Sequence, residues 1–88
     1  MDILKCASAG TMESSDASVE VQPGTGIEIT LESPVAGQFG DAIRTAVEQV
    51  LAEQGVKNAA VHVLDRGALE CVLKARVETA ILRGKGDA

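Results

Sequence analysis

Apolar and polar residues alternate along two segments in the first third of the chain, 18–22 and 27–32. A period of two turns one row of side chains toward a core and the other toward solvent, which predicts two β-strands. Pro23-Gly24-Thr25-Gly26 lies between them and has the composition of a turn. We therefore expect an antiparallel hairpin over about residues 17–32. A short strand within 8–14 is expected to precede it, with Ser14-Ser15-Asp16 as a tight connection at an exposed strand end.

Two later segments have the three-and-four spacing of amphipathic helices. The first is expected from Ser33-Pro34, a favourable N-cap pair, to about Gln54, and the second over about 68–83. The predicted inward residues are Val35, Phe39, Ala42, Ile43, Ala46, Val47, Val50 and Leu51 in the first helix, and Leu69, Val72, Leu73, Val77, Ala80 and Ile81 in the second. Between the helices, residues 58–64 are apolar on both faces, which indicates an interior strand.

The order of these elements predicts an α+β fold. We expect a small mixed or antiparallel sheet, made of an N-terminal β-meander and one later strand, with two helices packed on one face. A chain of 88 residues forms a single domain at this size, so residues 1–88 are expected to be one domain. Residues 84–88 have no packing pattern and are predicted to be a mobile tail.

Composition and charge narrow the possible partners. The chain has one Phe and no Trp or Tyr, so few rings are available to stack on nucleic acid bases. The net charge is −5, and residues 1–33 hold six acidic residues against Lys5 alone. Nucleic acid and anionic membranes would repel that surface, whereas a basic protein surface would attract it. Without a signal peptide pattern or a long apolar run, the expected location is the cytoplasm.

The side chains that usually perform catalysis are few. His62 lies within the predicted interior strand, which favours a structural role over a catalytic one. Cys6 and Cys71 are far apart and are predicted to be reduced, with Cys71 a packed thiol, and no metal site is expected. Glu13 and Asp16 are interpreted as a solvated, acidic turn in preference to a general acid and base. We therefore predict no catalytic residue.

Ser14 remains as the candidate for chemistry. Its hydroxyl has no histidine to deprotonate it, so it is a poor nucleophile for catalysis. A serine in a turn commonly bonds to its own backbone, and it can also accept a group that another enzyme attaches. Composition alone favours the turn serine, with the acceptor as the alternative.

Three blocks of sequence are similar to one known family. They are Ala9-Gly10-Thr11-Met12-Glu13-Ser14-Ser15-Asp16, then Gln38-Phe39-Gly40-Asp41-Ala42-Ile43-Arg44-Thr45, and finally Asp65-Arg66-Gly67-Ala68-Leu69-Glu70-Cys71 with Lys74-Ala75-Arg76-Val77-Glu78. In this order and at this length, the chain resembles the acyl carrier protein, or gamma subunit, of bacterial citrate lyase. The Asp-Ser-Leu segment of four-helix acyl carriers is absent, which disfavours a role in fatty-acid or polyketide synthesis.

The resemblance implies a covalent cofactor. In that family the matching serine carries 2'-(5''-phosphoribosyl)-3'-dephospho-CoA through a phosphodiester bond, which implies Ser14 here. Glycine is common where this chain has Ser15, so Ser15 is the alternative attachment point. The cofactor thiol would hold an acetyl thioester, which an alpha (acyl transferase) subunit exchanges for citryl before a beta (citryl lyase) subunit releases oxaloacetate.

The same resemblance implies partners, and one function of another class remains as its alternative. The expected partners are those two subunits and a prosthetic-group transferase, with no nucleic acid and no membrane. Charge reversal at Glu13 and Asp16 is predicted to slow loading or turnover at low salt, if the acidic third of the chain is a docking face. The alternative from another class is a non-covalent assembly module of a cytosolic complex that never carries a cofactor.

Overall fold

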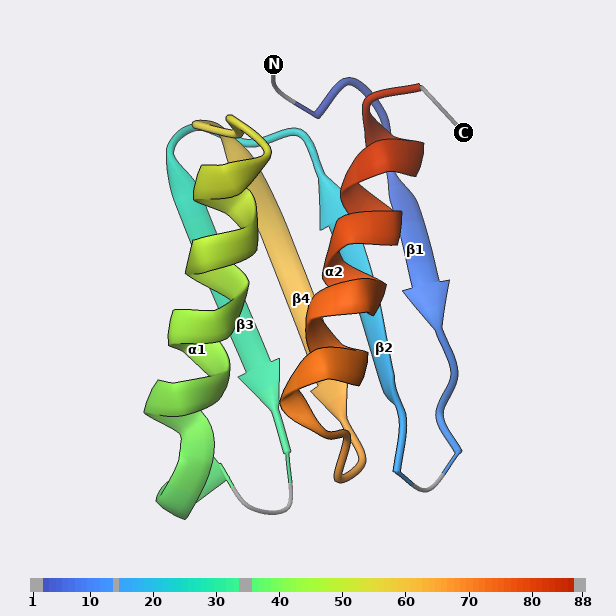
Figure 1. Ribbon diagram of the computed structural model, residues 1–88. Coiled ribbons are helices and arrows are strands. Elements are labelled where there is room, and N and C mark those ends of the chain that lie inside the picture. The colour runs from blue at the N-terminus through green and yellow to red at the C-terminus, as the bar shows by residue number, and fades with distance from the viewer. Residues whose placement is uncertain (1–2, 14, 34–35, 87–88) are drawn as a thin grey trace.

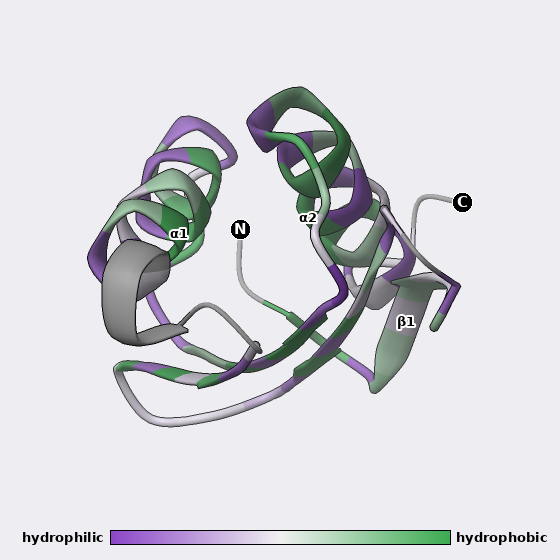
Figure 2. Cartoon of the chain, turned by 90° about the horizontal axis from the view of Figure 1, so that it is seen from below, coloured by the Kyte–Doolittle hydropathy of each residue, from purple (hydrophilic) through white to green (hydrophobic). Residues whose placement is uncertain are grey.

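A four-stranded mixed sheet and two helices make up the fold (Figure 1). The computed structural model describes residues 3–13, 15–33 and 36–86, with the backbone alone described for 36–39. The elements are β1 (Ala7–Gly10), β2 (Ala17–Gln22), β3 (Ile27–Glu32), α1 (Ala36–Glu53), β4 (Ala59–Asp65) and α2 (Glu70–Gly84). Figure 2 shows both helices on the same side of the sheet. The predicted α+β class, with two helices on one face, is confirmed.

The strand order is β1-β2-β4-β3, so β4 separates β2 from β3. β2 pairs with β4 in the antiparallel sense, and β3 pairs with β4 in the parallel sense. The predicted hairpin over 17–32 is therefore wrong. Val61 and Val63 of β4 are almost fully buried, and the central position covers this apolar strand on both edges. The interior position that its sequence predicted is confirmed.

The turn-like segment 23–26 crosses the end of β4. The Gly26 N–H donates to the Asn58 side chain at 2.8 Å, and the Gly26 carbonyl accepts the Ala59 N–H at 2.9 Å. A Cβ added to Gly24 would lie 3.1 Å from the Ala60 nitrogen, so the backbone passes close to β4. Turn composition predicted a change of direction correctly, but it could not determine which strand lies alongside.

The core lies between the sheet and the two helices. Its buried members are mainly Val and Ala, and they come from every element except β3: Ile3, Ala9, Ala17, Val19, Val21, Ala46, Val47, Val50, Leu51, Val56, Ala59, Val61, Val63, Leu73, Val77, Ala80 and Ile81. Ile29 and Leu31 of β3 are half-buried and pack against this cluster.

Several predicted helix positions differ from the structure. Leu69 is 70% exposed because it immediately precedes α2 instead of lying on its inner face. Cys71 is exposed, so the prediction of a packed thiol is wrong. Ala42 is exposed as well. The predicted positions of Pro34, Val35 and the Phe39 side chain lie outside the described residues, and α1 begins at Ala36.

The two ends of the described chain pack together. The Leu4 and Lys5 N–H groups both donate to the Gly84 carbonyl, at 2.9 and 3.1 Å. Ile3 is 4% exposed, and Gly84 is the buried last residue of α2. A Cβ at Gly84 would lie 3.0 Å from Val21 and 3.1 Å from Ile3. The packed part of the chain therefore extends to Gly84, the first residue of the predicted mobile tail, whereas residues 87–88 lie outside the described part.

Candidate functional site

The segment that contains the predicted attachment serine connects β1 to β2. It comprises residues 11–16 and is called the acceptor loop below. Ser14 itself lies outside the described residues, whereas Glu13 and Ser15 on either side of it are exposed. Ser15 has a φ of +66°, a conformation that few residues other than glycine adopt. The chain therefore turns sharply within the acceptor loop, at its surface.

The acceptor loop is held on one side by the turn that follows β4. The Ser15 N–H donates to the Arg66 carbonyl at 2.8 Å, and the Arg66 N–H donates to the Asp16 carbonyl at 2.9 Å. These two bonds lie just beyond the last pair of the antiparallel β2–β4 ladder, Ala17 and Asp65, and join Arg66 to both Ser15 and Asp16. The second limb of the acceptor loop is thereby fixed to the sheet, next to the predicted attachment point.

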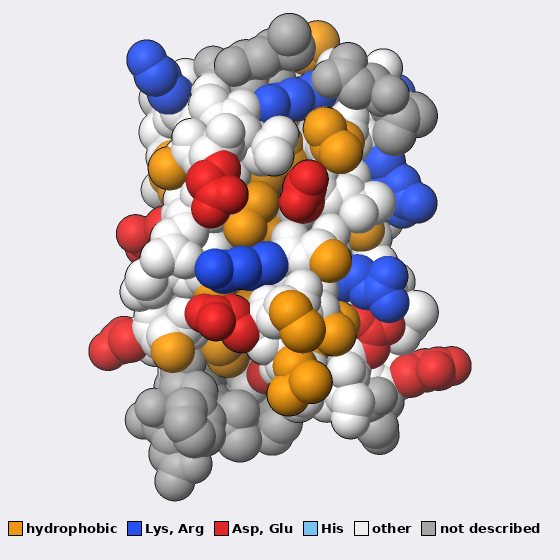
Figure 3. All heavy atoms as spheres, viewed as in Figure 1, with side chains coloured by type: hydrophobic (Ala, Val, Ile, Leu, Met, Phe, Trp, Pro, Cys, Tyr) orange, Lys and Arg blue, Asp and Glu red, His pale blue; other side chains and the backbone are white. Residues whose placement is uncertain are grey.

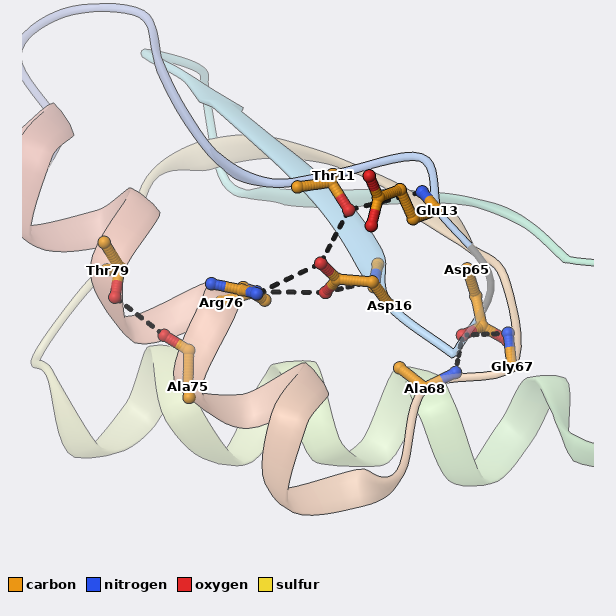
Figure 4. Close-up of polar contacts among 10 residues, drawn as sticks. Thr11, Glu13, Asp16, Asp65, Gly67, Ala68, Ala75, Arg76 and Thr79 are labelled. Carbon is orange, nitrogen blue, oxygen red and sulfur yellow. Dashed lines mark hydrogen bonds and ion pairs between the residues drawn. The ribbon is translucent and has the colours of Figure 1, made fainter.

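Asp16 is held on the other side by a side chain of α2. Its carboxylate accepts two hydrogen bonds of 3.0 Å from the Arg76 guanidinium, one from Nε and one from Nη2 (Figure 4). It also accepts the Thr11 hydroxyl and the Ala17 N–H, each at 2.7 Å. Two parallel bonds between a guanidinium and a carboxylate fix orientation as well as distance. One carboxylate thus joins both limbs of the acceptor loop to α2.

This environment changes the chemistry of Asp16. The Arg76 guanidinium, with smaller contributions from the Thr11 hydroxyl and the Ala17 N–H, holds the pKa of the Asp16 carboxyl well below its usual range. Asp16 in turn raises the pKa of Arg76. The Asp16 side chain is only 14% exposed. The interpretation of Glu13 and Asp16 as one solvated acidic turn is therefore wrong for Asp16, while Glu13 is exposed.

Asp65 organises the turn on which the acceptor loop rests. It is a buried charged residue, 3% exposed. Its Oδ1 accepts the Gly67 and Ala68 N–H groups at 3.1 and 2.9 Å, and its Oδ2 accepts the Ser33 hydroxyl at 2.8 Å. Figure 4 shows the Asp65 carboxylate turned toward its own turn. Ser33, predicted as the N-cap of the first helix, ties the end of β3 to this turn.

Two hollows flank Asp65. One, of about 360 Å³, lies beside the acceptor loop and is lined by Met12, Glu32, Ser33, Leu64, Asp65 and Arg66. The other, of about 340 Å³, lies between the helices, with apolar lining from Ile43, Ala46, Ala68 and Leu73. Hydrophobic side chains are visible among charged ones on this helical face in Figure 3.

The remaining predicted groups do not gather at the acceptor loop. His62 lies on the sheet face away from the helices, where its Nε2 is 2.7 Å from the Glu32 carboxylate. Cys6 and Cys71 are both unpaired thiols. Within 3–13, 15–33 and 36–86, no His, Cys, Asp or Glu side chains form a group of three that could hold a metal ion. The same described ranges contain no helix long and apolar enough to cross a membrane.

The periodicity of the sequence did not reveal the residues that hold the acceptor loop. Arg66, Arg76 and Asp65 are distant from it in sequence, and their patterns predicted only a turn and a helix surface. The one indication in the sequence was that these three residues belong to the third block of the family resemblance, while the acceptor loop belongs to the first block. Blocks one and three meet in space at the acceptor loop.

Comparisons with known proteins agree on one family. Residues 5–84 match the family described as malonate decarboxylase delta subunit (MdcD). A citrate lyase acyl carrier protein of Haemophilus influenzae (strain PittEE) is 53% identical over 87 residues, covering 99% of this chain and 92% of the relative. One from Latilactobacillus sakei is 47% identical, covering 98% and 86%.

A solved structure shares the fold. It is a chain of a Pseudomonas malonate decarboxylase hetero-tetramer in complex with malonate, with a TM-score of 0.76 at 22% identity, and the match covers 88% of this chain and 80% of that one. At this identity the likeness concerns the fold.

Proposed function

Because the chain belongs to the family of citrate lyase acyl carrier proteins and malonate decarboxylase delta subunits, we propose that it is the acyl carrier subunit of a citrate lyase complex. It would carry its prosthetic group on Ser14 and would catalyse no step itself. The observation that carries this proposal is the near-full-length match to relatives named for that role. A carrier for malonate decarboxylase is second, because the family description and the structural neighbour name that enzyme.

The acceptor loop suits covalent attachment. Thr11, Met12, Glu13 and Ser15 are exposed, so the surface next to Ser14 has room for a large polar group. The two limbs of the acceptor loop are nevertheless anchored, through Asp16 to α2 and through Ser15 to Arg66. An anchored loop with exposed residues on either side of the serine lets an enzyme bind the same backbone each time and leaves an attached arm free to move.

The proposed group is 2'-(5''-phosphoribosyl)-3'-dephospho-CoA, joined through a phosphodiester to the Ser14 oxygen, with Ser15 as the alternative. When bound, the group supplies the thiol on which acetyl and citryl are held as thioesters. The residues of this chain tether it, and the tether raises the effective concentration of the acyl group at the partner active sites. Asp16 is not available as a base for the serine, because its carboxylate is occupied by four hydrogen bonds and its pKa is lowered.

The proposed partners are an acyl transferase (alpha) subunit, a citryl lyase (beta) subunit and the transferase that attaches the prosthetic group, all in the cytoplasm. Glu13 is the exposed acidic residue of the acceptor loop and is suited to orient a basic partner surface. The rival function, a non-covalent assembly module, requires the same fold but no attached group.

Intact mass tests the proposal. The carrier is co-expressed with its native prosthetic-group transferase and the enzymes that supply the cofactor, and fragment masses then locate the modification. We expect a mass gain equal to the proposed group, on the peptide that contains Ser14, which Ser14→Ala abolishes and Ser15→Ala preserves. A gain that Ser15→Ala alone abolishes would assign the alternative serine. An unmodified wild-type chain that still assembles with the complex would support the non-covalent module.

A further inference from the structure

We propose that Arg76 is a positioning residue for attachment of the prosthetic group. By holding Asp16, it keeps the acceptor loop in the conformation that the attaching transferase binds. This inference rests on the proposed function, and it concerns a residue of α2 that lies 60 positions from Asp16 in sequence.

The first support is the connectivity of the acceptor loop. The Asp16 carboxylate accepts bonds from Thr11 at the start of the acceptor loop and from Arg76 on the helix. The Thr11 hydroxyl in turn accepts the Glu13 N–H at 3.2 Å. A continuous series of bonds therefore runs from α2 through Asp16 and Thr11 to the residue immediately before Ser14 (Figure 4).

The second support is the close approach of Arg76 to the start of the acceptor loop. A Cβ added to Gly10 would lie 3.3 Å from Cδ of Arg76, so the aliphatic part of the arginine passes next to the last residue of β1. The neighbouring residue Val77 is fully buried, which fixes α2 to the core beneath this arginine. Arg76 is thus held by a rigid element: its guanidinium contacts the acceptor loop, and its stem passes beside Gly10, the residue before that loop.

The two anchors of the acceptor loop have different roles. The bonds between Ser15, Asp16 and Arg66 use backbone atoms and hold only the second limb. The first limb is joined to the second by the bond from the Thr11 hydroxyl to the Asp16 carboxylate and by the Asp16 N–H, which donates to the Glu13 carbonyl at 3.2 Å. Without Arg76, that carboxylate keeps its bonds within the loop but loses its attachment to α2. The acceptor loop would then sample other conformations, and the transferase would bind only the fraction that remains suitable.

Steady-state kinetics of attachment test this role. Wild type, Arg76→Gln, Arg76→Lys and Asp16→Asn are compared as substrates of the native transferase, with the mass gain as the measure of rate. Arg83→Gln is the matched control, because Arg83 lies two turns further along α2 and donates to the Ser8 carbonyl at 2.8 Å, away from the acceptor loop. Urea unfolding establishes that each variant is folded under assay conditions.

We expect Arg76→Gln to raise the KM for the carrier on the order of tenfold while kcat stays close to wild type, because saturating transferase selects the suitable conformation. Arg76→Lys keeps the charge but not the paired bonds, so its KM should lie between those of wild type and Arg76→Gln. The double variant Arg76→Gln, Asp16→Asn should have a KM no higher than that of either single variant. Hydrogen exchange of the Glu13 and Ala17 amides, read without the transferase, should accelerate in Arg76→Gln and not in Arg83→Gln.

Unchanged KM in a folded Arg76→Gln carrier would overturn the positioning role, as would an equal rise in KM for Arg83→Gln. Accelerated exchange without a change in KM would also count against it, because the acceptor loop would then be ordered by Arg76 with no effect on attachment. A wild-type carrier that gains no mass would instead contradict the proposed function, so the two failures are distinguishable.

Discussion

The Arg76 guanidinium and the Asp16 carboxylate face each other across two parallel hydrogen bonds of 3.0 Å, and this contact joins helix α2 to the acceptor loop. It lowers the pKa of Asp16 in the folded protein. A carboxyl group with a lowered pKa stabilises the fold above its unfolded pKa, about 4, and this stabilisation is lost as the pH falls through the folded value.

The first prediction concerns acid stability. The free energy of unfolding of wild type should fall steadily below about pH 4. At pH 7, Asp16→Asn should have a lower free energy of unfolding than wild type. The difference between the two proteins should narrow as the pH decreases. Urea unfolding between neutral and strongly acidic pH measures both curves, with Glu28→Gln, an exposed carboxylate on β3, as the control. If the two stability curves ran parallel, the lowered pKa of Asp16 would not contribute to the pH dependence of stability, and the prediction would be contradicted.

The second prediction concerns the buried carboxylate of Asp65. Asp65→Ala leaves two backbone N–H groups and the Ser33 hydroxyl without this acceptor, so it should destabilise the protein by about 2–4 kcal/mol. Ser33→Ala removes one of those donors and should cost about 1 kcal/mol. Asp41→Ala, at an exposed helical site, should change stability by less than about 0.5 kcal/mol. Equal small effects at Asp65 and Asp41 would show that the turn does not need its carboxylate.

The third prediction compares two glycines with positive φ. Gly10 has a φ of +94°, and a Cβ there would collide with the carbonyl oxygen of Ala17, on strand β2, which pairs with β1 in the antiparallel sense. Gly26 has a φ of +73° and open space around it. Gly26→Ala should cost about 1 kcal/mol from backbone conformation alone, and Gly10→Ala about 2 kcal/mol or more. Thermal unfolding measures the difference, and a Gly10→Ala chain as stable as Gly26→Ala would contradict the collision.

The fourth prediction concerns the N-terminal segment. Ile3 is buried against Gly84, whereas its neighbour Leu4 is 70% exposed. Ile3→Ala should destabilise the protein by about 2–4 kcal/mol, and Leu4→Ala by less than about 0.5 kcal/mol. Urea unfolding of the pair tests whether the segment before β1 belongs to the core. Comparable losses of stability for Ile3→Ala and Leu4→Ala would show that this segment is not part of the core.

The fifth prediction separates the two acidic residues of the acceptor loop. Glu13 is exposed, so Glu13→Lys should slow prosthetic-group attachment several-fold at low salt, and added salt should remove the effect. Asp16→Lys is not a test of docking, because it also breaks the contact with Arg76. Glu28→Lys, on β3, is the control. Attachment rates that do not change at low ionic strength would argue against docking through Glu13.

Local sequence patterns determined the elements of this fold. Alternating side chains marked β2 and β3, the doubly apolar segment marked β4 as interior, and three-and-four spacing marked both helices close to their observed bounds. These features depend on which face of a residue's own element is buried. They are therefore encoded within a few residues of each position.

The family could also be predicted from the sequence, because three blocks of residues match it in the same order. Tertiary structure decided what these patterns could not express. It placed β4 between β2 and β3, in place of the predicted hairpin, because strand pairing depends on competition among distant segments. It also brought Arg66 and Arg76 to the acceptor loop, where one shares backbone bonds and the other holds Asp16. Such contacts join residues separated by 50 or more positions, and no periodicity of a single element records them.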